Sequence, residues 1–185
     1  PAAERTAAAR PVAAADLLLN LRSLRLALGD AEGASRDLDD AVHRATALGD
    51  QLLVSKARHN LGYAEYLRGD LPVALRAMDE AAAQAPDRHA AVGLIDRAQV
   101  LLDAGLLTEA DEALSEAREH LSRYRMLRDL AEVELVRSRV VLGLRRYAEA
   151  RRLARSASRR FDRLGNRPWG LRARVAELQA ALTEH

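Results

Sequence analysis

The chain has 185 residues, of which 49% are hydrophobic and 3% aromatic, and its formal net charge is +2. This content suffices for one domain-sized core, and alanine and leucine with few β-branched runs favour helices. The sequence contains no cysteine, which excludes disulfides, thiolate nucleophiles and cysteine-ligated zinc and fits a reducing, cytoplasmic location.

The start of the chain shows neither a membrane span nor a signal peptide. Asp16, Arg22 and Arg25 interrupt the leucine-rich stretch near the start, so no apolar run is long enough to cross a bilayer. The first residues lack the charge order and the long apolar centre of a signal peptide. Because the chain begins at Pro1 without a methionine, we expect it to be a piece of a longer protein.

Charge is unevenly distributed along the chain. Residues 1–134 hold 16 Lys+Arg against 23 Asp+Glu, a net −7, whereas residues 135–185 hold 13 against 4, a net +9. Such an asymmetry is compatible with an electrostatic partner.

The first predicted hairpin covers about residues 15–48 and follows an N-terminal arm. Residues 1–14 are alanine-rich and interrupted by Pro11, and we expect an arm or the end of a preceding helix. Leucines then predict one helix, Gly29-Asp30 a turn, and a second helix follows. Arg22 stands where the next hairpin has a glycine, so this hairpin fits the repeat pattern least well.

The segment from Ser55 to Arg88 matches the pattern of a 34-residue helical hairpin. The small, large and turn-forming residues at matching offsets are Leu61, Gly62, Gly69, Leu71, Ala74, Met78, Ala81 and Pro86. This pattern resembles a tetratricopeptide repeat (TPR), although Arg58 and Glu65 replace its tryptophan and tyrosine.

Each match in this segment has a steric reason. Gly62, Ala74 and Ala81 are small enough to let two antiparallel helices approach. Gly69 ends the first helix, and Asp70 caps the second. Gly49-Asp50 is expected to play the same double role at the start of this hairpin.

Two further hairpins and a last helix are predicted downstream. The hairpin over about residues 91–124 has small and large residues in register at Ala98, Gly105, Leu107, Ala110, Leu114 and Ala117, with Thr108 to Asp111 as a capping sequence. The hairpin over about 131–164 has Ser138, Tyr147, Ala150, Ala154 and Ala157 in register, with Gly143 slightly before the expected turn and a first helix beginning near Tyr124. Gly165 to Pro168 interrupts the chain, and a closing helix is expected over 168–183.

Together these elements predict an all-α fold: a right-handed α-α superhelix, or TPR solenoid, of about four helical hairpins plus a C-terminal closing helix. The TPR domain covers residues 15–185. The repeat starts, at positions 15, 55, 91 and 131, are spaced more widely than the repeat unit of a TPR, so helices or loops must be extended. A plain helical bundle would also show leucine stripes, but it does not predict the same Gly/Ala/Ala order four times.

No catalytic constellation is present, so the chain is not expected to be an enzyme or to hold a metal or cofactor. The histidines lie in separate repeats or at the terminus, without a metal-binding spacing; they are His43, His59, His89, His120 and His185. An acidic cluster, Asp37, Asp39 and Asp40, lies on one helix, where a solvated acidic face is the expected role.

The candidate binding site is the concave face formed by the first helix of each hairpin. The TPR resemblance places the ligand-facing positions at Asn20, Ser23, Lys56, His59, Asn60, Tyr63, Tyr66, Asp96, Gln99, Asp103, Glu132 and Arg139. Polar groups and two tyrosines suit an extended peptide or a helix, unless Tyr63 or Tyr66 packs between repeats. In TPR arrays that bind acidic chaperone C-termini, a carboxylate clamp occupies this groove, and only Asn60 matches it here.

An arginine series near the C-terminus supports an alternative, nucleic-acid binding. Its members are Arg145, Arg146, Arg151, Arg152, Arg155, Arg159, Arg160 and Arg163. Such charge density binds phosphates, but aromatic residues for base stacking are sparse. We expect instead that these arginines lie on an outer helix that binds no ligand.

Beyond the general repeat, three phrases resemble the repeat region that precedes CHAT domains in actinobacterial proteins. They are HNLGYAEYLRGDLPVALRAMDEA, LIDRAQVLLDAGLLTEADEAL and RRFDRLGNRPWGLRAR. CHAT domains are caspase-like cysteine peptidases, and this cysteine-free chain cannot supply their nucleophile. The resemblance therefore implies the recognition or regulatory region of a TPR-CHAT protein.

The sequence thus predicts a non-catalytic scaffold that binds a protein or peptide. One alternative is a ligand-sensing TPR module of a transcriptional or signalling regulator. Another is self-association, in which the acidic first repeat of one copy docks on the basic fourth repeat of another.

Overall fold

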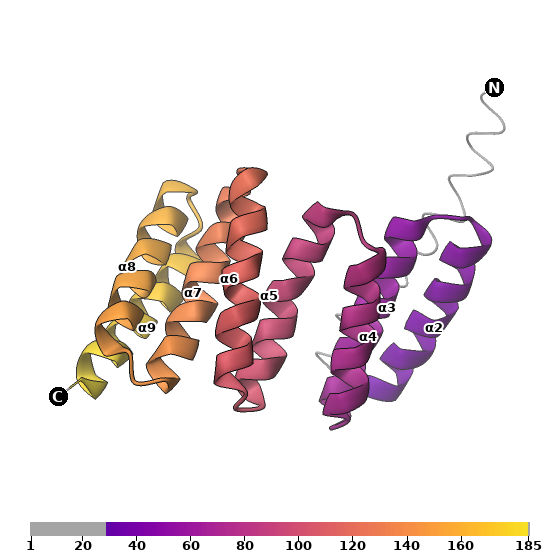
Figure 1. Ribbon diagram of the computed structural model, residues 1–185, viewed down its shortest axis with the longest axis horizontal. Coiled ribbons are helices and arrows are strands. Elements are labelled where there is room, and N and C mark those ends of the chain that lie inside the picture. The colour runs from indigo at the N-terminus through magenta and orange to yellow at the C-terminus, as the bar shows by residue number, and fades with distance from the viewer. Residues whose placement is uncertain (1–28, 185) are drawn as a thin grey trace. The chain divides into compact units, whose positions relative to one another are not determined.

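The computed structural model describes residues 29–184, which form eight helices and no strand (Figure 1). The prediction of an all-α chain is confirmed. The N-terminal arm and the first helix of the first predicted hairpin, with Asn20 and Ser23, lie outside the described residues. The chain divides into two compact units, with the boundary between Ala90 and Ala91.

Unit 1 contains three antiparallel helices: α2 (Ala31–Ala47), α3 (Gln51–Leu67) and α4 (Leu71–Gln84). The middle helix, α3, packs against both neighbours. Ser55 of α3 is buried, and its hydroxyl donates a hydrogen bond of 2.9 Å to the carbonyl oxygen of Ala81 in α4.

Unit 2 contains α5 (Asp87–Asp103), whose first turn precedes the boundary, and then α6 (Leu107–Arg123), α7 (Leu127–Gly143), α8 (Tyr147–Arg163) and α9 (Arg167–Thr183). α7 packs against α6 and α8 and also contacts α9, while α8 packs against α9. Each helix is followed by the next in the up-and-down order of Figure 1.

A regular helix length gives both units the same repeat. Every described helix except α4 has the same length, 17 residues. Successive helices begin at even intervals, at positions 31, 51 and 71 in one series and at 87, 107, 127, 147 and 167 in the other. A hairpin is therefore longer than the repeat unit of a TPR, and the excess lies in the helices. The series shifts after α4, which has only 14 residues and ends at Gln84; its C-cap residue, Ala85, is extended with ψ 148° and precedes Pro86.

Glycine-containing turns end α2 and α3 of unit 1 as the sequence predicts. Gly49 has φ 69° and Gly69 has φ 92°, left-handed values that favour glycine. At the first of these turns the amide of Asp50 donates to the carbonyl of Ala45, and Gly49 donates to Thr46, which is the hydrogen-bond pattern of a Schellman motif.

The aspartate after each of these glycines caps the next helix. An Oδ1 atom of Asp50 accepts a hydrogen bond of 3.0 Å from the amide of Leu53, and Asp70 accepts one of 3.1 Å from Val73. Each bond satisfies one of the amides that a helix N-terminus leaves without an intrahelical partner.

Two local predictions for unit 2 are wrong. α6 begins at Leu107 with Leu106 as its cap and no side-chain capping bond, so Thr108 to Asp111 lie inside the helix. α7 begins at Leu127, and Tyr124 instead ends α6. The turn after Gly143 was predicted correctly: Gly143 is the last residue of α7, and the left-handed turn residue that follows is Arg145, with φ 60°.

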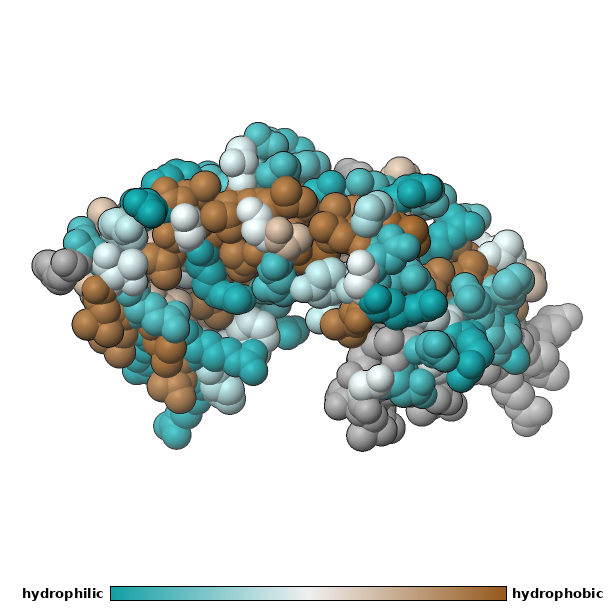
Figure 2. Space-filling model, turned by 90° about the horizontal axis from the view of Figure 1, so that it is seen from below, coloured by the Kyte–Doolittle hydropathy of each residue, from teal (hydrophilic) through white to brown (hydrophobic). Residues whose placement is uncertain are grey.

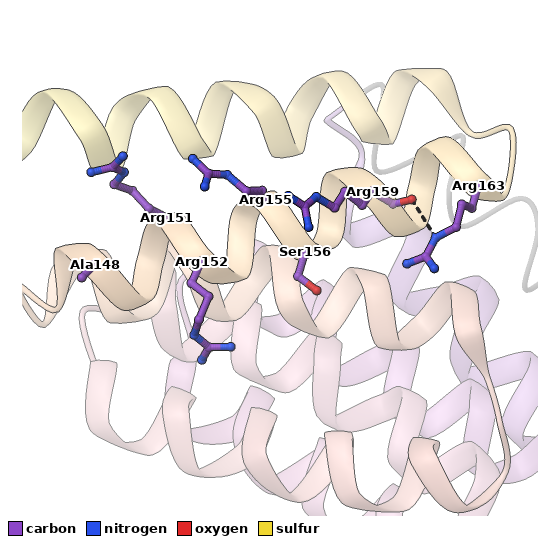
Figure 3. A pocket seen from close by; sticks show the side chains of 7 residues that line it. All are labelled: Ala148, Arg151, Arg152, Arg155, Ser156, Arg159 and Arg163. Carbon is purple, nitrogen blue, oxygen red and sulfur yellow. Dashed lines mark hydrogen bonds between the residues drawn. The ribbon is translucent and has the colours of Figure 1, made fainter.

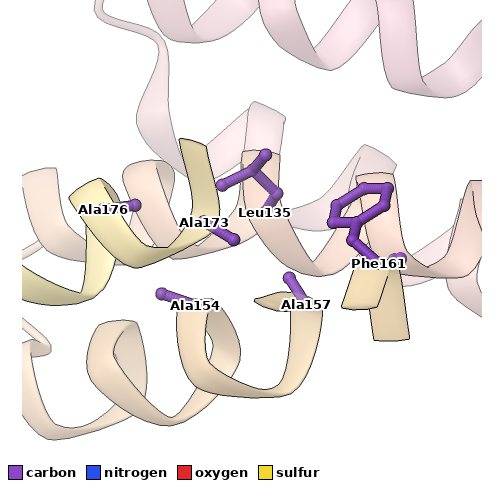
Figure 4. Packing of buried hydrophobic residues seen from close by; sticks show 7 residues of the cluster. Leu135, Ala154, Ala157, Phe161, Ala173 and Ala176 are labelled. Atoms are coloured by element: carbon purple, nitrogen blue, oxygen red, sulfur yellow. The ribbon is translucent and has the colours of Figure 1, made fainter. Parts of the chain in front are cut away.

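One core cluster of unit 2 consists mainly of alanines around one large ring. Phe161 of α8 is 1% exposed and packs with alanines and Leu135 from three helices (Figure 4). Other members of this cluster are Ala131, Ala154, Ala157, Ala173 and Ala176. Because their side chains are small, α7, α8 and α9 lie close together, which places the faces of α7 and α9 side by side.

Candidate binding surface

The predicted site residues that the structure describes fall into two groups. Five lie on α3 in unit 1: Lys56, His59, Asn60, Tyr63 and Tyr66. Five lie in unit 2, on α5 and α7: Asp96, Gln99, Asp103, Glu132 and Arg139. Each group is described within its own unit.

In unit 1 the predicted residues form an exposed and half-buried face of α3. Lys56 is exposed, and His59, Asn60, Tyr63 and Tyr66 are half-buried. The rings of the two tyrosines are 6.0 Å apart between centroids and tilted by 45°, a geometry of favourable aromatic contact.

In unit 2 four of the five predicted residues line one pocket of about 610 Å³ between α5, α7 and α9. They are Asp96, Gln99, Glu132 and Arg139. Asp103 does not line the pocket, but its Oδ1 accepts a hydrogen bond of 2.7 Å from Gln99. The structure therefore brings four of the predicted residues together, and their role in binding stays a prediction.

The end of the pocket near Arg139 is held by a short polar chain. A terminal nitrogen of Arg139 donates a hydrogen bond of 2.8 Å to Oε1 of Gln99, and the other lies 4.0 Å from Asp103. The side-chain amide of Gln99 thus lies between an arginine and a carboxylate. Its oxygen faces the guanidinium, and its nitrogen faces the carboxylate. This end can present a guanidinium and amides to polar groups of a ligand.

The other end of the pocket contains a carboxylate in an unfavourable environment. Burial raises the pKa of Glu132, and the charges of Asp96 and Asp129 raise it further, while Arg128 and Arg172 act in the opposite direction. No residue of the described chain forms a hydrogen bond or ion pair with Glu132. A ligand cation placed here would relieve this destabilisation of the charged carboxylate.

The sequence did not predict the third wall, α9. Trp169 packs on Phe161 with 5.5 Å between ring centroids, and the guanidinium carbon of Arg172 lies 5.0 Å from the centre of the Trp169 ring. Leu171 and Val175 also line the pocket and are 62% and 46% exposed. Apolar side chains reach the surface at this end of unit 2, at the left of Figure 2.

The regular spacing of α5, α7 and α9 is the sequence pattern that could have placed α9 in the pocket. The pocket residues Ile95, Asp96 and Gln99 of α5 recur at equivalent positions two helices later as Leu135, Val136 and Arg139, and again as Val175, Ala176 and Gln179. The pocket is therefore built from the same three positions of three successive first helices. The sequence prediction assigned α9 only the role of a closing helix, so none of its residues was included in the predicted concave face.

Two other kinds of site were sought in the described residues. Within residues 29–184, no helix is long and apolar enough to span a membrane. The same part of the chain contains no group of three His, Asp or Glu side chains arranged to hold a metal ion.

Paired antiparallel helices with a shared inner face define the class: an all-α helical repeat protein with a TPR-like fold. Two crystal structures of kinesin-light-chain-like TPR repeats from Podosopora anserina are similar to this chain, with TM-scores of 0.71 and 0.65 and 15% and 16% identity. Each match covers 89% of this chain, and 84% and 87% of those chains.

A third similar structure is a Rap protein complexed with Competence and Sporulation Factor, with a TM-score of 0.61 and 17% identity. That match covers 92% of this chain and 53% of the Rap protein. No protein-family model matches the sequence, and no curated protein does.

Proposed function

We propose that the chain is a non-catalytic scaffold that binds a segment of a protein or peptide in the pocket between α5, α7 and α9. The observation that carries the proposal is the composition of this pocket: an exposed apolar wall on α9 faces polar side chains of α5 and α7. Peptide grooves combine such apolar contact area with a few polar groups that fix orientation.

The chemistry of the two ends suggests the orientation of the ligand. Glu132 and Asp96 favour a cationic group at one end, and Arg139 with Gln99 favours a carboxylate or carbonyl at the other. Between them, Leu171 and Val175 offer contact to an apolar side chain. The similar Rap protein, which is complexed with a factor, supports a ligand-binding role for this fold, by analogy.

Selection of random dodecapeptides on the purified chain tests this function. We expect enriched peptides to carry an apolar residue next to a basic one. In Val175→Glu the apolar wall acquires a charge, and affinity should fall more than tenfold. Leu178→Glu is the matched control, because Leu178 is exposed on the same helix but does not line the pocket.

The proposal fails if no peptide is enriched, or if Leu178→Glu weakens binding as much as Val175→Glu. Melting curves of both variants show whether they remain folded. Since both side chains are substantially exposed, we expect little change in stability.

The finer assignment is that the chain is the recognition or regulatory region of a larger CHAT-peptidase protein. Its support is the resemblance of three segments. Because the chain contains no cysteine, the nucleophile of such a peptidase would have to come from another domain. Reading the open frame beyond His185 tests it. A downstream His/Cys pair would support the assignment, and a DNA-binding or kinase domain would instead favour the sensing module.

A further inference from the structure

The outer surface of α8 carries arginines that the proposed peptide pocket does not use. α8 holds six arginines against two carboxylates, Glu149 and Asp162. An open pocket of about 570 Å³ runs along this helix and is lined by Ala148, Ser156 and five arginines (Figure 3). We call these arginines the α8 arginine surface: Arg151, Arg152, Arg155, Arg159 and Arg163.

Two of the five arginines are neutralised by α9. A terminal nitrogen of Arg151 lies 2.9 Å from Glu184, and Nε of Arg155 donates a hydrogen bond of 2.7 Å to Glu177. Figure 3 shows both side chains on the side of α8 that faces α9. These two arginines therefore have a structural role in joining the last two helices.

The other three arginines lack such a partner. Arg152 points away from α9 in Figure 3, is 68% exposed and lies 3.9 Å from Glu149. Glu149 is already shared with Arg146 and Arg137. In the described chain no carboxylate lies within 4.0 Å of the guanidinium of Arg159 or Arg163.

The helix dipole does not explain all three. Cations in the last turn of a helix are favourable, which accounts for Arg163. Arg152 lies in the first half of α8, where the dipole gives a cation no advantage. Arg152, Ser156, Arg159 and Arg163 are four, three and four residues apart, so they follow one face of the helix over about 16 Å.

The surroundings of this surface favour phosphate groups over other anionic partners. Protein interfaces have an apolar centre, but Ala148 is the only apolar residue lining this pocket. No large apolar side chain of α8 is exposed, which argues against insertion into a lipid surface. Phe161 is buried, and Tyr147, the other aromatic residue of α8, is half-buried. Neither ring lines this pocket, so stacking on bases is not expected here.

We propose that the α8 arginine surface binds the phosphate backbone of nucleic acid without stacking on its bases or reading its sequence. Guanidinium groups donate paired hydrogen bonds to phosphate oxygens, and the Ser156 hydroxyl adds a donor between Arg152 and Arg159. With three arginines that α9 does not neutralise, the logarithm of the affinity should fall with the logarithm of salt concentration with a slope of about −2.

Fluorescence anisotropy with a labelled oligothymidylate of twenty nucleotides tests the proposal on the whole chain. At about 50 mM salt we expect a dissociation constant of order 10 μM, weakening steeply toward 200 mM. Replacing Arg152, Arg159 and Arg163 by glutamine should weaken binding at least tenfold. The matched control replaces three exposed arginines on other helices, Arg36, Arg76 and Arg118, and should change it less than twofold.

Four outcomes overturn the proposal. They are no binding at low salt, equal losses in both triple variants, equal or tighter binding of a polyglutamate peptide of the same length, and tighter binding of anionic vesicles. The third would indicate an acidic protein partner, and the fourth a membrane. If the triple variant is unstable, Arg159→Gln decides: a salt slope reduced by about 0.7 supports the proposal, and an unchanged slope rejects it.

Discussion

Arg137 of α7 and Asp111 of α6 form an ion pair in which Nε donates a hydrogen bond of 2.5 Å to Oδ1. Their side chains are only 14% and 16% exposed. Arg146, in the turn before α8, donates a second bond of 2.8 Å to the other oxygen of Asp111. One carboxylate therefore joins three consecutive elements of unit 2.

Asp111→Asn should destabilise the fold at neutral pH by about 1–3 kcal/mol, because it removes a carboxylate that binds two guanidinium groups and leaves both of them to Glu149 alone. Burial raises the pKa of Asp111, but hydrogen bonds and charges from Arg137 and Arg146 outweigh it and lower the pKa from its ordinary value of 3.8. The carboxylate thus contributes stability above pH 3.8 that is lost as pH falls through the folded-state pKa. Urea unfolding at several pH values measures this.

Asp40→Asn is the control for this prediction, since Asp40 pairs with Arg44 on an exposed helix face at 49% and 53% exposure. Such pairs contribute about 0–1 kcal/mol. Equal losses in the two variants, or a loss in Asp111→Asn that persists at the lowest pH, would contradict the role given to Asp111.

Gly62→Ala should destabilise unit 1 by about 1–3 kcal/mol, although alanine favours helices by about 1 kcal/mol. A Cβ atom at Gly62 would lie 2.8 Å from the carbonyl oxygen of Ala74 and 2.9 Å from Met78, and the backbone cannot give way without separating α3 from α4. Thermal unfolding followed by circular dichroism measures the change.

Gly143→Ala makes the same substitution with the opposite expectation. The added Cβ would lie 2.8 Å from Cδ1 of Leu107, the end of a flexible side chain that can rotate. The helix propensity of alanine should then dominate, leaving stability unchanged or up to about 1 kcal/mol higher. If both variants lose stability equally, the close approach of α3 and α4 is not the reason for a glycine at position 62.

The sequence predicted turns where glycine marks them. Where glycine does not, the turn at Arg125 was missed, and the turn at Arg145 was expected only from the repeat register. Gly49 and Gly69 have left-handed φ values, and each is followed by a capping aspartate. In unit 2 the same conformation falls on Arg125 and Arg145, residues that carry no local turn signal. Only the regular helix length locates those turns, because Arg145 ends a helix at the position equivalent to that of the left-handed Gly105, two helices earlier.

Arg145→Gly should therefore stabilise the fold by about 0.5–1 kcal/mol. Arg145 is exposed with φ 60°, a conformation that costs residues with a Cβ about 1–2 kcal/mol, and part of this gain is offset by the greater freedom of glycine in the unfolded chain. Arg152→Gly, inside α8, should instead cost about 1 kcal/mol. Chemical denaturation measures whether each variant gains or loses unfolding free energy. If both variants lose it, the side chain of Arg145 stabilises its turn.

The residues that line the pocket were predictable only where the repeat register assigned positions to them. Asp96, Gln99, Glu132 and Arg139 lie on first helices, where the register assigns ligand-facing positions, and they line one pocket. Trp169 lies on α9, a helix without a following partner among the described residues. Its contribution depends on contacts with Phe161 and Arg172, which no local pattern encodes.

Glu132→Gln should stabilise the fold at neutral pH. Because burial and the charge of Asp96 raise the pKa of Glu132, the ionised carboxylate is less favourable in the folded than in the unfolded chain. The stability that the protonated carboxyl of Glu132 contributes is fully present below its ordinary pKa of 4.5. This stability is lost as pH rises through the folded-state pKa. The variant should therefore melt higher than wild type at neutral pH and equally below pH 4.5.

Glu134→Gln, two residues away on α7, should change stability in the opposite direction. Glu134 is 13% exposed and accepts a hydrogen bond of 3.0 Å from Nε of Arg160, so losing its charge should lower the melting temperature at neutral pH. A gain at Glu132 beside a loss at Glu134 would separate a carboxylate kept for a ligand from one that holds two helices together, since binding sites retain groups that stability alone disfavours. If Glu132→Gln also lowers the melting temperature at neutral pH, the carboxylate stabilises the free protein and its role as a cation site in the peptide pocket loses its physical basis.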